Sequence, residues 1–301
     1  MPFLSIIIAA HNSSRTLPAT LESLSLALGK VEDTEVIILN DSSTDNTQEV
    51  IDEWCLRLQN VHIEKVDYCN IGKVRQHALS LASGDYITML DSDDLLKPQS
   101  LQNAINCLRE QQPDMLLTHL LEIRDLSKIT TDWYGVIPER LNKHEAIRRF
   151  LIHKDFQAHL IGQFVSRDLY LQSPIPPISC YEDFAVFPGM LMNARHIIYQ
   201  PNGHYYYVKR PNSLSSSLDA NKINHLFDCT LNMEQVFPPE FKHLMNCHWF
   251  NLWTNHKQRL NALQLETVKT RIKQVYSLAF FLSKDIRFSY KKRAIRALWK
   301  K

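Results

Sequence analysis

The sequence predicts an α/β protein with a mostly parallel sheet flanked by helices, followed by a helical C-terminal region. Short apolar runs alternate with amphipathic stretches through the first third of the 301 residues. Clusters of polar residues directly follow these runs, where parallel strands would end. Beyond residue 217 several stretches are amphipathic and none has the composition of a strand. We therefore expect one α/β domain over residues 1–217 and a helical region over residues 218–301.

The composition is that of a soluble globular protein whose charge is unevenly distributed. Hydrophobic residues make up 45% of the chain and charged residues 22%, which is ordinary for a globular protein. The chain is long enough to bury the core of one large domain and an appended piece. Residues 284–301 carry eight basic side chains and one acidic side chain, so this tail has a charge of +7 and the rest of the chain −5.

Several classes of protein are disfavoured by what the sequence lacks. The six cysteines are scattered without Cys-x-x-Cys or zinc spacing, which indicates reduced thiols in a cytosolic protein. The apolar run at residues 3–10 is short and has no basic leader, so we expect a first core strand. No run approaches the roughly 20 apolar residues of a transmembrane helix. A Gly-x-x-x-x-Gly-Lys-Ser/Thr loop is absent, which argues against a P-loop nucleotidase.

The apolar and amphipathic runs define the elements of the first third in order. The expected strands are residues 4–10, 35–39, 61–66, 86–90 and 115–123, and the expected helices are residues 16–28, 45–58, 73–82 and 98–109. The first helix is typical, because its leucines recur at helical spacing along one face. Such alternation favours a parallel sheet with right-handed crossovers, which binds ligands beyond the carboxyl ends of its strands.

Two polar motifs follow the first two expected strands. Residues 11–14 read His-Asn-Ser-Ser, and residues 40–47 read Asn-Asp-Ser-Ser-Thr-Asp-Asn-Thr. In the second motif we expect Ser43 or Thr44 to cap the following helix. Asp41 precedes this cap at the ligand-facing edge, where its carboxylate can accept a hydrogen bond from the N3–H of a uracil ring.

A third motif, Asn-Ile-Gly-Lys-Val-Arg at residues 70–75, opens the helix before the fourth strand. Gly72 permits a tight turn at this point. Arg75 lies one turn inside the helix, and an arginine near a helix N-terminus pairs well with phosphate. The alternative is that Lys73 and Arg75 are solvated charges on the helix surface.

Three carboxylates follow the fourth strand at once. Asp91 and Asp93 point the same way if the chain stays extended, because side chains alternate along a strand. Paired carboxylates repel each other unless a cation lies between them, and oxygen ligands favour Mg²⁺ or Mn²⁺. Such an ion, with open coordination positions, can bind a diphosphate. The alternative is a solvated acidic turn that caps the next helix.

In order and spacing, these motifs resemble those of the family 2 glycosyltransferases, which have the GT-A fold, a Rossmann-type, mostly parallel sheet. The resemblance rests on Ser-Ile-Ile-Ile-Ala-Ala-His-Asn at residues 5–12, the motifs at 40–47 and 70–72, and Gly-Asp-Tyr-Ile-Thr-Met-Leu-Asp-Ser-Asp-Asp at 84–94. It extends to residue 217, and it implies metal-dependent, inverting transfer of a sugar from a nucleotide diphosphate to an acceptor hydroxyl. Two residues depart from the family pattern: Asn40 stands where aspartate is usual, and His11 where tyrosine is common.

The resemblance also implies roles for individual residues. Contacts to the nucleotide sugar would come from Ala10, His11, Asn12, Asp41, Gly72, Arg75, Asp91, Ser92 and Arg210. Asp91 and Asp93 match the Asp-x-Asp signature of the family. Asp93 would ligate Mg²⁺ or Mn²⁺ directly, and Asp91 would contact the ribose or the metal from the other side. Asp94 would have a structural role.

An acidic pair about ninety residues beyond this signature can supply the base that an inverting transfer requires. The acceptor oxygen attacks the anomeric carbon, and a carboxylate must accept its proton. By the resemblance, Asp183 is the catalytic base, and Glu182 positions the acceptor or orients the base. The alternative is that both acids simply occupy the first turn of an apolar helix that runs to residue 192.

The segment after this helix predicts two strands, residues 196–200 and 205–209, around a Pro-Asn-Gly turn at 201–203. Arg210 follows the second strand and can pair with a diphosphate. The alternative for Arg210 is an exposed surface charge.

The last part of the C-terminal region contains apolar residues near a helical period among the basic ones, namely Phe281, Phe288, Ile295 and Trp299. This composition is typical of a helix that lies on an anionic membrane surface. The alternative is a helix packed on the catalytic domain with a solvated basic face. Binding to nucleic acid is disfavoured, because no recognition motif accompanies the charge.

Taken together, the patterns and the resemblance imply a UDP-sugar-dependent hexosyl- or N-acetylhexosaminyl-transferase that is cytoplasmic and peripheral on the inner face of the plasma membrane. From the family alone, we expect a glycan or lipid-linked acceptor in bacterial lipopolysaccharide or capsule synthesis. One alternative is a non-catalytic nucleotide-sugar-binding protein, against which the presence of Asp183 argues. Another is a sugar nucleotidylyltransferase, whose first loop should be rich in glycine and contain arginine, unlike residues 11–14.

Overall fold

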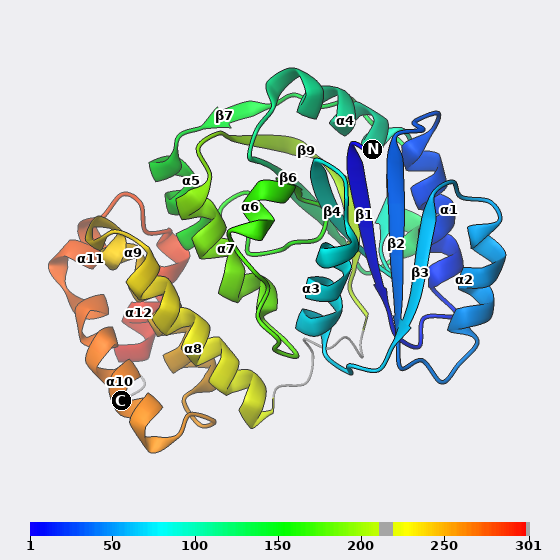
Figure 1. Cartoon of the computed structure of the whole chain (residues 1–301). Helices are drawn as coiled ribbons and strands as arrows, with labels where there is room; N and C mark the ends of the chain where they lie inside the picture. Colours follow the sequence, from blue (N-terminus) through cyan, green and yellow to red (C-terminus); the bar gives the residue numbers. More distant parts are fainter. Residues whose placement is uncertain (211–218, 299–301) are drawn as a thin grey trace.

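The computed structural model describes residues 1–210 and 219–298, which form a sheet with flanking helices and a group of C-terminal helices beside it (Figure 1). The strands are β1 (Leu4–Ala10), β2 (Thr34–Asp41), β3 (Val61–Val66), β4 (Tyr86–Asp91), β5 (Leu95–Leu96), β6 (Met115–Ile123), β7 (Glu139–Leu141), β8 (Phe164–Ser166) and β9 (Ile197–Val208). The helices are α1 (Leu17–Leu28), α2 (Thr47–Cys55), α3 (Ile71–Leu81), α4 (Ser100–Gln111), α5 (Lys143–Leu151), α6 (Arg167–Leu171), α7 (Glu182–Asn193), α8 (Ala220–Val236), α9 (Lys242–His256), α10 (Ala262–Ile272), α11 (Leu278–Leu282) and α12 (Phe288–Leu298).

The sheet is mixed and mostly parallel. Its strands lie in the order β3-β2-β1-β4-β8-β6-β9-β5, with β7 paired to β9. β1 pairs in parallel with β2 and with β4, whereas β8 runs antiparallel between β4 and β6. The predicted fold class, a mostly parallel α/β sheet with a helical C-terminal region, is confirmed. The expected domain boundary between residues 217 and 218 lies outside the described residues.

The sheet is buried because helices cover it on both sides. β1 and β4 are almost entirely buried along their length, as expected for parallel strands between two layers of helices. Figure 1 shows α3 on one side of these strands and α1 on the other. The leucine stripe of α1 faces the sheet, and its four leucines, Leu17, Leu21, Leu24 and Leu28, are all buried. The 3.6-residue period therefore located this helix correctly.

The expected cap of the second helix is wrong. α2 begins at Thr47, so neither Ser43 nor Thr44 is its N-cap. The Asp45 carboxylate accepts hydrogen bonds from the backbone and hydroxyl of Thr47, and its other oxygen accepts two from Ser14. Asp45 therefore joins the polar loops after β1 and β2, which both border the site described below.

The hairpin expected around residues 201–203 is also wrong, because β9 is one continuous strand from Ile197 to Val208. The pairing of β9 with β6 shifts register within the Pro-Asn-Gly segment. A Cβ added to Gly203 would lie 2.6 Å from Leu121 Cγ and 2.8 Å from the carbonyl oxygen of His119. The glycine thus permits a bulge pressed against β6 instead of a reversal of the chain.

The C-terminal helices pack around a core of their own that continues the main one. Trp249 of α9 is fully buried and Trp253 is partly buried against the core. α12 buries Tyr290 and Ala294, whereas Phe288 and Ile295 are 77% and 48% exposed. α12 is therefore packed on the protein, in agreement with the alternative of a packed helix. Its other face still exposes apolar side chains. Trp299 lies outside the described residues.

None of the helices in residues 1–210 and 219–298 is long and apolar enough to cross a membrane.

Candidate active site

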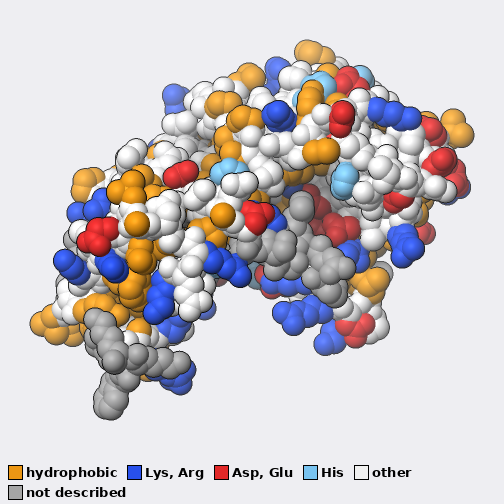
Figure 2. Space-filling model, turned by 90° about the horizontal axis from the view of Figure 1, so that it is seen from below, with side chains coloured by type: hydrophobic (Ala, Val, Ile, Leu, Met, Phe, Trp, Pro, Cys, Tyr) orange, Lys and Arg blue, Asp and Glu red, His pale blue; other side chains and the backbone are white. Residues whose placement is uncertain are grey.

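A cavity of about 1140 Å³ lies at the carboxyl ends of β1, β2 and β4, and the start of α7 together with α8, α9 and α12 lines the rest of it. Figure 2 shows acidic side chains in a hollow between the sheet and the C-terminal helices, with Lys and Arg side chains nearby. Every residue predicted to belong to the site, apart from Gly72, lines this cavity. The polar motifs at the strand ends and the acidic pair of α7 therefore share one space.

Asp41, at the end of β2, is buried and holds the loop that leads to α3. Its Oδ1 accepts hydrogen bonds from the backbone N–H of Tyr68 (2.7 Å) and of Cys69 (3.0 Å), and its Oδ2 accepts one from Asn70 (3.2 Å). A carboxylate oxygen has two lone pairs, so Oδ2 retains acceptor capacity. The predicted contact to a uracil ring would be an addition to this structural role.

His11 and Asn12 form the edge of the cavity after β1. His11 Nδ1 lies 2.6 Å from the carbonyl oxygen of Asp41 and must donate to it, which leaves Nε2 as the acceptor from Asn12 Nδ2 (3.1 Å). Asn12 has a left-handed backbone, with φ of 48°, and its Oδ1 accepts from the N–H of Thr44 (2.8 Å). Both side chains are exposed, so a base or ribose could lie against them.

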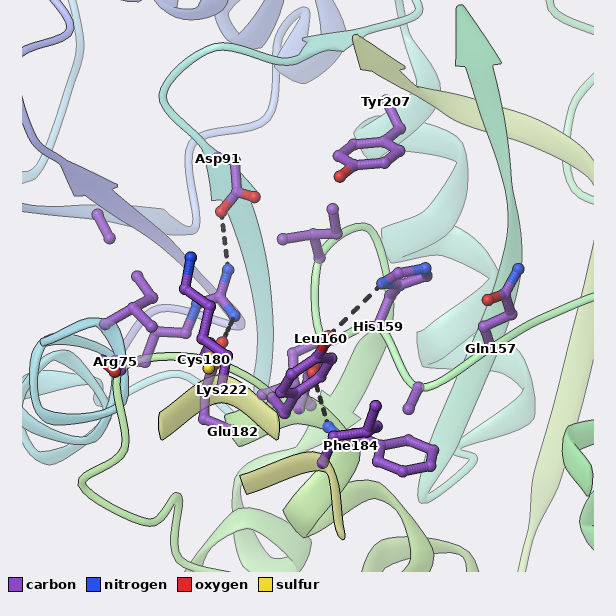
Figure 3. A pocket seen from close by; sticks show the side chains of 18 of the residues that line it. Arg75, Asp91, Gln157, His159, Leu160, Cys180, Glu182, Phe184, Tyr207 and Lys222 are labelled. Carbon is purple, nitrogen blue, oxygen red and sulfur yellow. Dashed lines mark hydrogen bonds and ion pairs between the residues drawn. The ribbon is translucent and has the colours of Figure 1, made fainter. Parts of the chain in front are cut away.

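Arg75 lies between two carboxylates and forms ion pairs with both (Figure 3). Its Nη2 is 2.8 Å from Asp91 Oδ1, and its Nη1 pairs with Glu182 Oε1. The side chains of Arg75 and Glu182 are 8% and 6% exposed. Burial raises the pKa of Glu182, and the positive charge of Arg75 opposes this rise. The alternative of a solvated Arg75 is therefore wrong: Arg75 joins the acidic motif after β4 to the acidic pair of α7.

Asp93 is paired with Arg210, which follows β9. Arg210 Nε lies 3.1 Å from Asp93 Oδ2, and its Nη2 donates to the Asp93 carbonyl at 2.6 Å. Burial and the charge of Asp91 raise the pKa of Asp93, and Arg210 opposes them. Arg210 is thus an ion-pair partner within the site and not an isolated surface charge.

Asp94 and Ser92, the neighbours of Asp93 in the chain, make contacts within the protein. Asp94 accepts hydrogen bonds from the Tyr205 hydroxyl (2.7 Å) and from the N–H of Val208 (2.8 Å), which ties the acidic loop to β9. Ser92 Oγ lies 2.7 Å from Ser13 Oγ in a buried position. The Ser92 carbonyl accepts from the Thr16 hydroxyl at 3.0 Å, so Ser92 joins the loops after β1 and β4, and its contact with the nucleotide sugar stays a prediction.

Asp183, in the first turn of α7, is partly exposed in the cavity and faces a histidine. Its Oδ1 accepts from the N–H of Phe184 (2.7 Å), while its Oδ2 lies 3.5 Å from His159 Nδ1. His159 also lines the cavity (Figure 3). Sequence reasoning missed His159, because no ligand spacing or repeat marks residues 157–160.

Gly72 allows close packing, and it does not form the tight turn that we expected from the sequence. It is the second residue of α3, and its N–H donates to the carbonyl of Ile178 at 3.1 Å. A Cβ added at Gly72 would lie 2.2 Å from the Pro176 carbonyl oxygen and 2.7 Å from that of Ile178. The start of α3 therefore contacts the backbone of the segment that leads to Glu182 and Asp183.

The carboxylates of the acidic loop suit a hard divalent cation that is bound partly by the protein and partly by a substrate. Among the described residues no cluster of three or more His, Cys, Asp or Glu side chains is arranged to hold a metal alone. Asp91 and Asp93 offer carboxylate oxygens on one cavity wall, and Mg²⁺ is commonly bound by one or two carboxylates plus phosphates and water.

The mixed, mostly parallel sheet with helices on both sides and a cavity at its carboxyl edge is GT-A-like. The model of the family described as Glycosyl transferase family 2 matches residues 5–158, just over half of the chain. The protein belongs to this family.

Two curated relatives and two solved complexes are similar to this chain. It is 37% identical over 114 residues to the UDP-Glc:alpha-D-GlcNAc-diphosphoundecaprenol beta-1,3-glucosyltransferase WfaP of Escherichia coli, over 37% of this chain and 43% of WfaP. It is 29% identical over 115 residues to the poly(ribitol-phosphate) beta-N-acetylglucosaminyltransferase TarS of Staphylococcus aureus, over 38% of this chain and 20% of TarS. The chain thus matches less than half the length of these two relatives.

The fold matches more of the chain than the sequence does. S. aureus TarS 1–349 in complex with UDP-GlcNAc superposes with a TM-score of 0.71 at 18% identity, over 91% of this chain and 81% of that one. The mannosyltransferase PcManGT from Pyrobaculum calidifontis, in complex with GDP-Man and Mn²⁺, gives a TM-score of 0.61 at 14% identity, over 100% of this chain and 88% of that one. At these identities the two superpositions establish the fold.

Proposed function

We propose that this protein is an inverting glycosyltransferase that transfers a sugar from a UDP-sugar to a hydroxyl of a glycan or lipid-linked acceptor. One observation supports this most strongly: the cavity brings Asp91 and Asp93, at the end of β4, together with Asp183, some ninety residues later in the chain. A nucleotide-binding edge and a carboxylate facing the same space are what such a transfer requires. The solved TarS complex with UDP-GlcNAc supports UDP as the nucleotide.

Asp183 is the proposed catalytic base. Its Oδ2 faces His159, whereas Oδ1 is engaged by the backbone of α7. The acceptor oxygen forms a bond to the anomeric carbon while the bond from that carbon to the diphosphate breaks. The acceptor proton passes to Asp183 Oδ2, and the bonding electron pair leaves with the nucleotide diphosphate. Attack opposite the leaving group inverts the anomeric configuration.

Asp91 and Asp93 are the residues that would hold Mg²⁺ or Mn²⁺, which would supply positive charge to the departing diphosphate. The PcManGT complex with Mn²⁺ supports a metal-assisted reaction in this fold. Arg75 orients Asp91 and Glu182 by pairing with both. Arg210 is the residue of this chain placed to exchange a carboxylate partner for a phosphate.

The base is tested with Asp183→Asn, which keeps the size of the side chain and removes its capacity to accept a proton. We expect transfer to fall by at least 100-fold while UDP affinity changes less than twofold. Asp228→Asn, an exposed aspartate of α8, is the matched control and should keep full activity. Turnover above about a tenth of wild type in Asp183→Asn would exclude it as the base.

The donor class is tested by thermal shift with nucleotide diphosphates, each with and without Mn²⁺. Stabilisation by UDP that increases with Mn²⁺ is expected, because a ligand that binds the folded state raises its stability. Slow hydrolysis of the matching UDP-sugar would separate an enzyme from a non-catalytic binding protein. The acidic pair and the family match favour a transferase over a sugar nucleotidylyltransferase.

The acceptor that we propose is a bacterial surface glycan, such as lipopolysaccharide or capsule, assembled at the inner face of the plasma membrane. The named activity of WfaP, on a diphosphoundecaprenol-linked sugar, supports a lipid-linked acceptor. The exposed side chains of Phe288 and Ile295, among basic residues of α12, suit attachment to anionic lipid.

This attachment is tested by sedimentation with vesicles that contain phosphatidylglycerol. The double variant Phe288→Ser/Ile295→Ser should stay in the supernatant, because it loses the apolar side chains that would enter the lipid. The control is Leu126→Ser, which removes an exposed leucine outside α12 and should sediment like wild type. Equal sedimentation of all three proteins would mean that α12 serves packing alone.

A further inference from the structure

The cavity continues past Asp183 onto the C-terminal helices. The residues that line this part are His248, Asn251, Leu252 and Asn255 of α9, and Tyr290 and Arg293 of α12. The α9 residues recur at intervals of three and four, so they share one face of the helix. The chemistry proposed above does not use any of them.

This helix face begins beside the proposed base. The ring of Phe184, the residue after Asp183, stacks on His248 with centroids 5.9 Å apart. Asn255 lies seven residues further along α9, which is about 10 Å at the rise of an α-helix. The lining of α9 therefore leads away from Asp183 toward α12.

Arg293 is held rigidly at this end of the cavity. Its Nη1 donates to Asn251 Oδ1 (2.9 Å) and its Nη2 donates to Thr254 Oγ1 (2.6 Å). The guanidinium also lies over the rings of Tyr290 and Phe250, at 5.5 and 5.6 Å from their centroids. Cation–π contacts and neutral acceptors fix the orientation of the group without cancelling its charge.

Arg293 differs in this respect from the arginines of the donor side. Arg75 and Arg210 have carboxylate partners, whereas Arg293 has none among residues 1–210 and 219–298. A guanidinium has five N–H groups, and the contacts of Arg293 involve only Nη1 and Nη2. Its Nε–H therefore has no partner in the described part of the chain.

A second polar group that lines the cavity, at the end of α9, lacks a partner among the described residues as well. His256 lines the cavity, and its buried Nδ1 makes no hydrogen bond with any described residue. Buried polar atoms are nearly always paired. The unpaired Nδ1 of His256, one residue after the Asn255 that contacts Arg293, is therefore consistent with a polar ligand at this end of the cavity.

We propose that the α9–α12 end of the cavity binds an anionic phosphate or pyrophosphate group of the acceptor, with Arg293 as its main contact. This inference rests on the proposed function, because it assigns the acceptor side of the same cavity. Arginine suits phosphate oxygens through paired N–H donors, and partial burial in the cavity strengthens the contact. The proposed donor diphosphate lies at the other wall, beside Asp91 and Asp93. A pyrophosphate-linked lipid and a phosphodiester polymer share this chemistry, and the test below distinguishes the two sources.

The test is isothermal titration of the full chain saturated with UDP, so that the donor site is filled. The two probes are geranyl diphosphate, for a lipid source, and a glycerol-phosphate oligomer, for a polymer source. Arg293→Gln should weaken the probe that wild type binds by about 10- to 100-fold, the effect of losing a charged hydrogen bond. The matched control is Arg296→Gln, an exposed arginine of the same helix that does not line the cavity, and it should change binding less than twofold.

A second variant guards against loss of structure in Arg293→Gln. Asn251→Asp keeps the shape of the side chain and places a carboxylate against Arg293, so it should also weaken the anion by about tenfold. Both variants should bind UDP like wild type.

The outcomes separate this inference from the proposed function. Binding of geranyl diphosphate alone supports a lipid-linked acceptor, and binding of the oligomer alone supports a polymer. A wild-type protein that binds UDP but neither probe, or equal losses in Arg293→Gln and Arg296→Gln, would overturn the phosphate subsite and leave the transferase intact. A protein that does not bind UDP would overturn the proposed function itself.

Discussion

Removing the charge of Arg75 is the sharpest test of how the two halves of the site are joined. Arg75→Met leaves Glu182 buried and without a cation, since the Glu182 side chain is only 6% exposed. Breaking a buried ion pair by deleting one partner costs about 3–5 kcal/mol. Asp91 is 32% exposed and can be hydrated when its partner is removed, so it adds at most about 1 kcal/mol. The expected loss in the free energy of unfolding is therefore about 3–5 kcal/mol.

The assay is urea unfolding followed by tryptophan fluorescence at pH 7.5, in a double-variant cycle with Glu182→Met. Replacing a whole buried ion pair by apolar side chains is often close to neutral, so Arg75→Met/Glu182→Met should regain most of the loss. The reasoning fails if Arg75→Met lies within 1 kcal/mol of wild type. It also fails if the double variant is no more stable than Arg75→Met alone.

Three further predictions concern packing, acid stability and metal affinity. Gly72→Ala should lose about 1–3 kcal/mol of stability, because its Cβ would lie 2.2 Å from a backbone oxygen. The control is Gly189→Ala in α7, whose Cβ meets no atom within 4 Å and which should be neutral or stabilising. Equal melting temperatures of the two variants would contradict this. Burial lowers the pKa of His204 and of His248 to about 3, so the unfolded chain, with pKa values near 6.5, binds two protons that the folded chain does not. The stability that these two histidines contribute is complete above pH 6.5 and is lost as the pH falls toward 3, while the raised pKa values of Asp94 and Glu182 act in the opposite direction. In urea titrations at pH 7, 6 and 5, His248→Gln should therefore lose less stability than wild type as the pH falls, and an equal pH dependence in the two proteins would refute the reasoning. Arg210→Gln removes the ion-pair partner of Asp93 and should tighten Mn²⁺ binding in the absence of nucleotide by about fivefold, which corresponds to the free energy of a half-exposed ion pair. Calorimetry that shows unchanged or weaker Mn²⁺ binding would rule out competition between Arg210 and the metal.

The elements of the first third were predictable because each obeys a simple period. β3 and β6 have the bounds that their apolar runs predict, and α1 differs by one residue. β1, β4 and α1 bury one face or both, and the period of two or 3.6 residues reports burial directly there, whereas the residues of β3 are partly buried or exposed. The placing of polar motifs at strand ends follows from the parallel sheet, so the position of the cavity was predictable too.

The partners within the cavity were not predictable, since a period identifies the buried face of an element and not what it meets. Arg75 pairs with Glu182 across 107 residues, and no local pattern connects them. His159 carries no signal until the fold places it beside Asp183. The Pro-Asn-Gly segment of β9 has the composition of a turn, but pairing with β6 on both sides of it overrides that tendency.

The pairing of Arg210 with Asp93 has a consequence for the order in which the ligands would assemble. In the free protein an internal cation already occupies one side of Asp93. A bare metal ion would have to displace Arg210 and leave that guanidinium without a counter-charge. A metal ion arriving together with a diphosphate supplies the displaced arginine with new oxygens, so both exchanges become favourable at once. Occupancy of the metal site would then depend on the concentration of the nucleotide-sugar donor and only weakly on the concentration of the free ion.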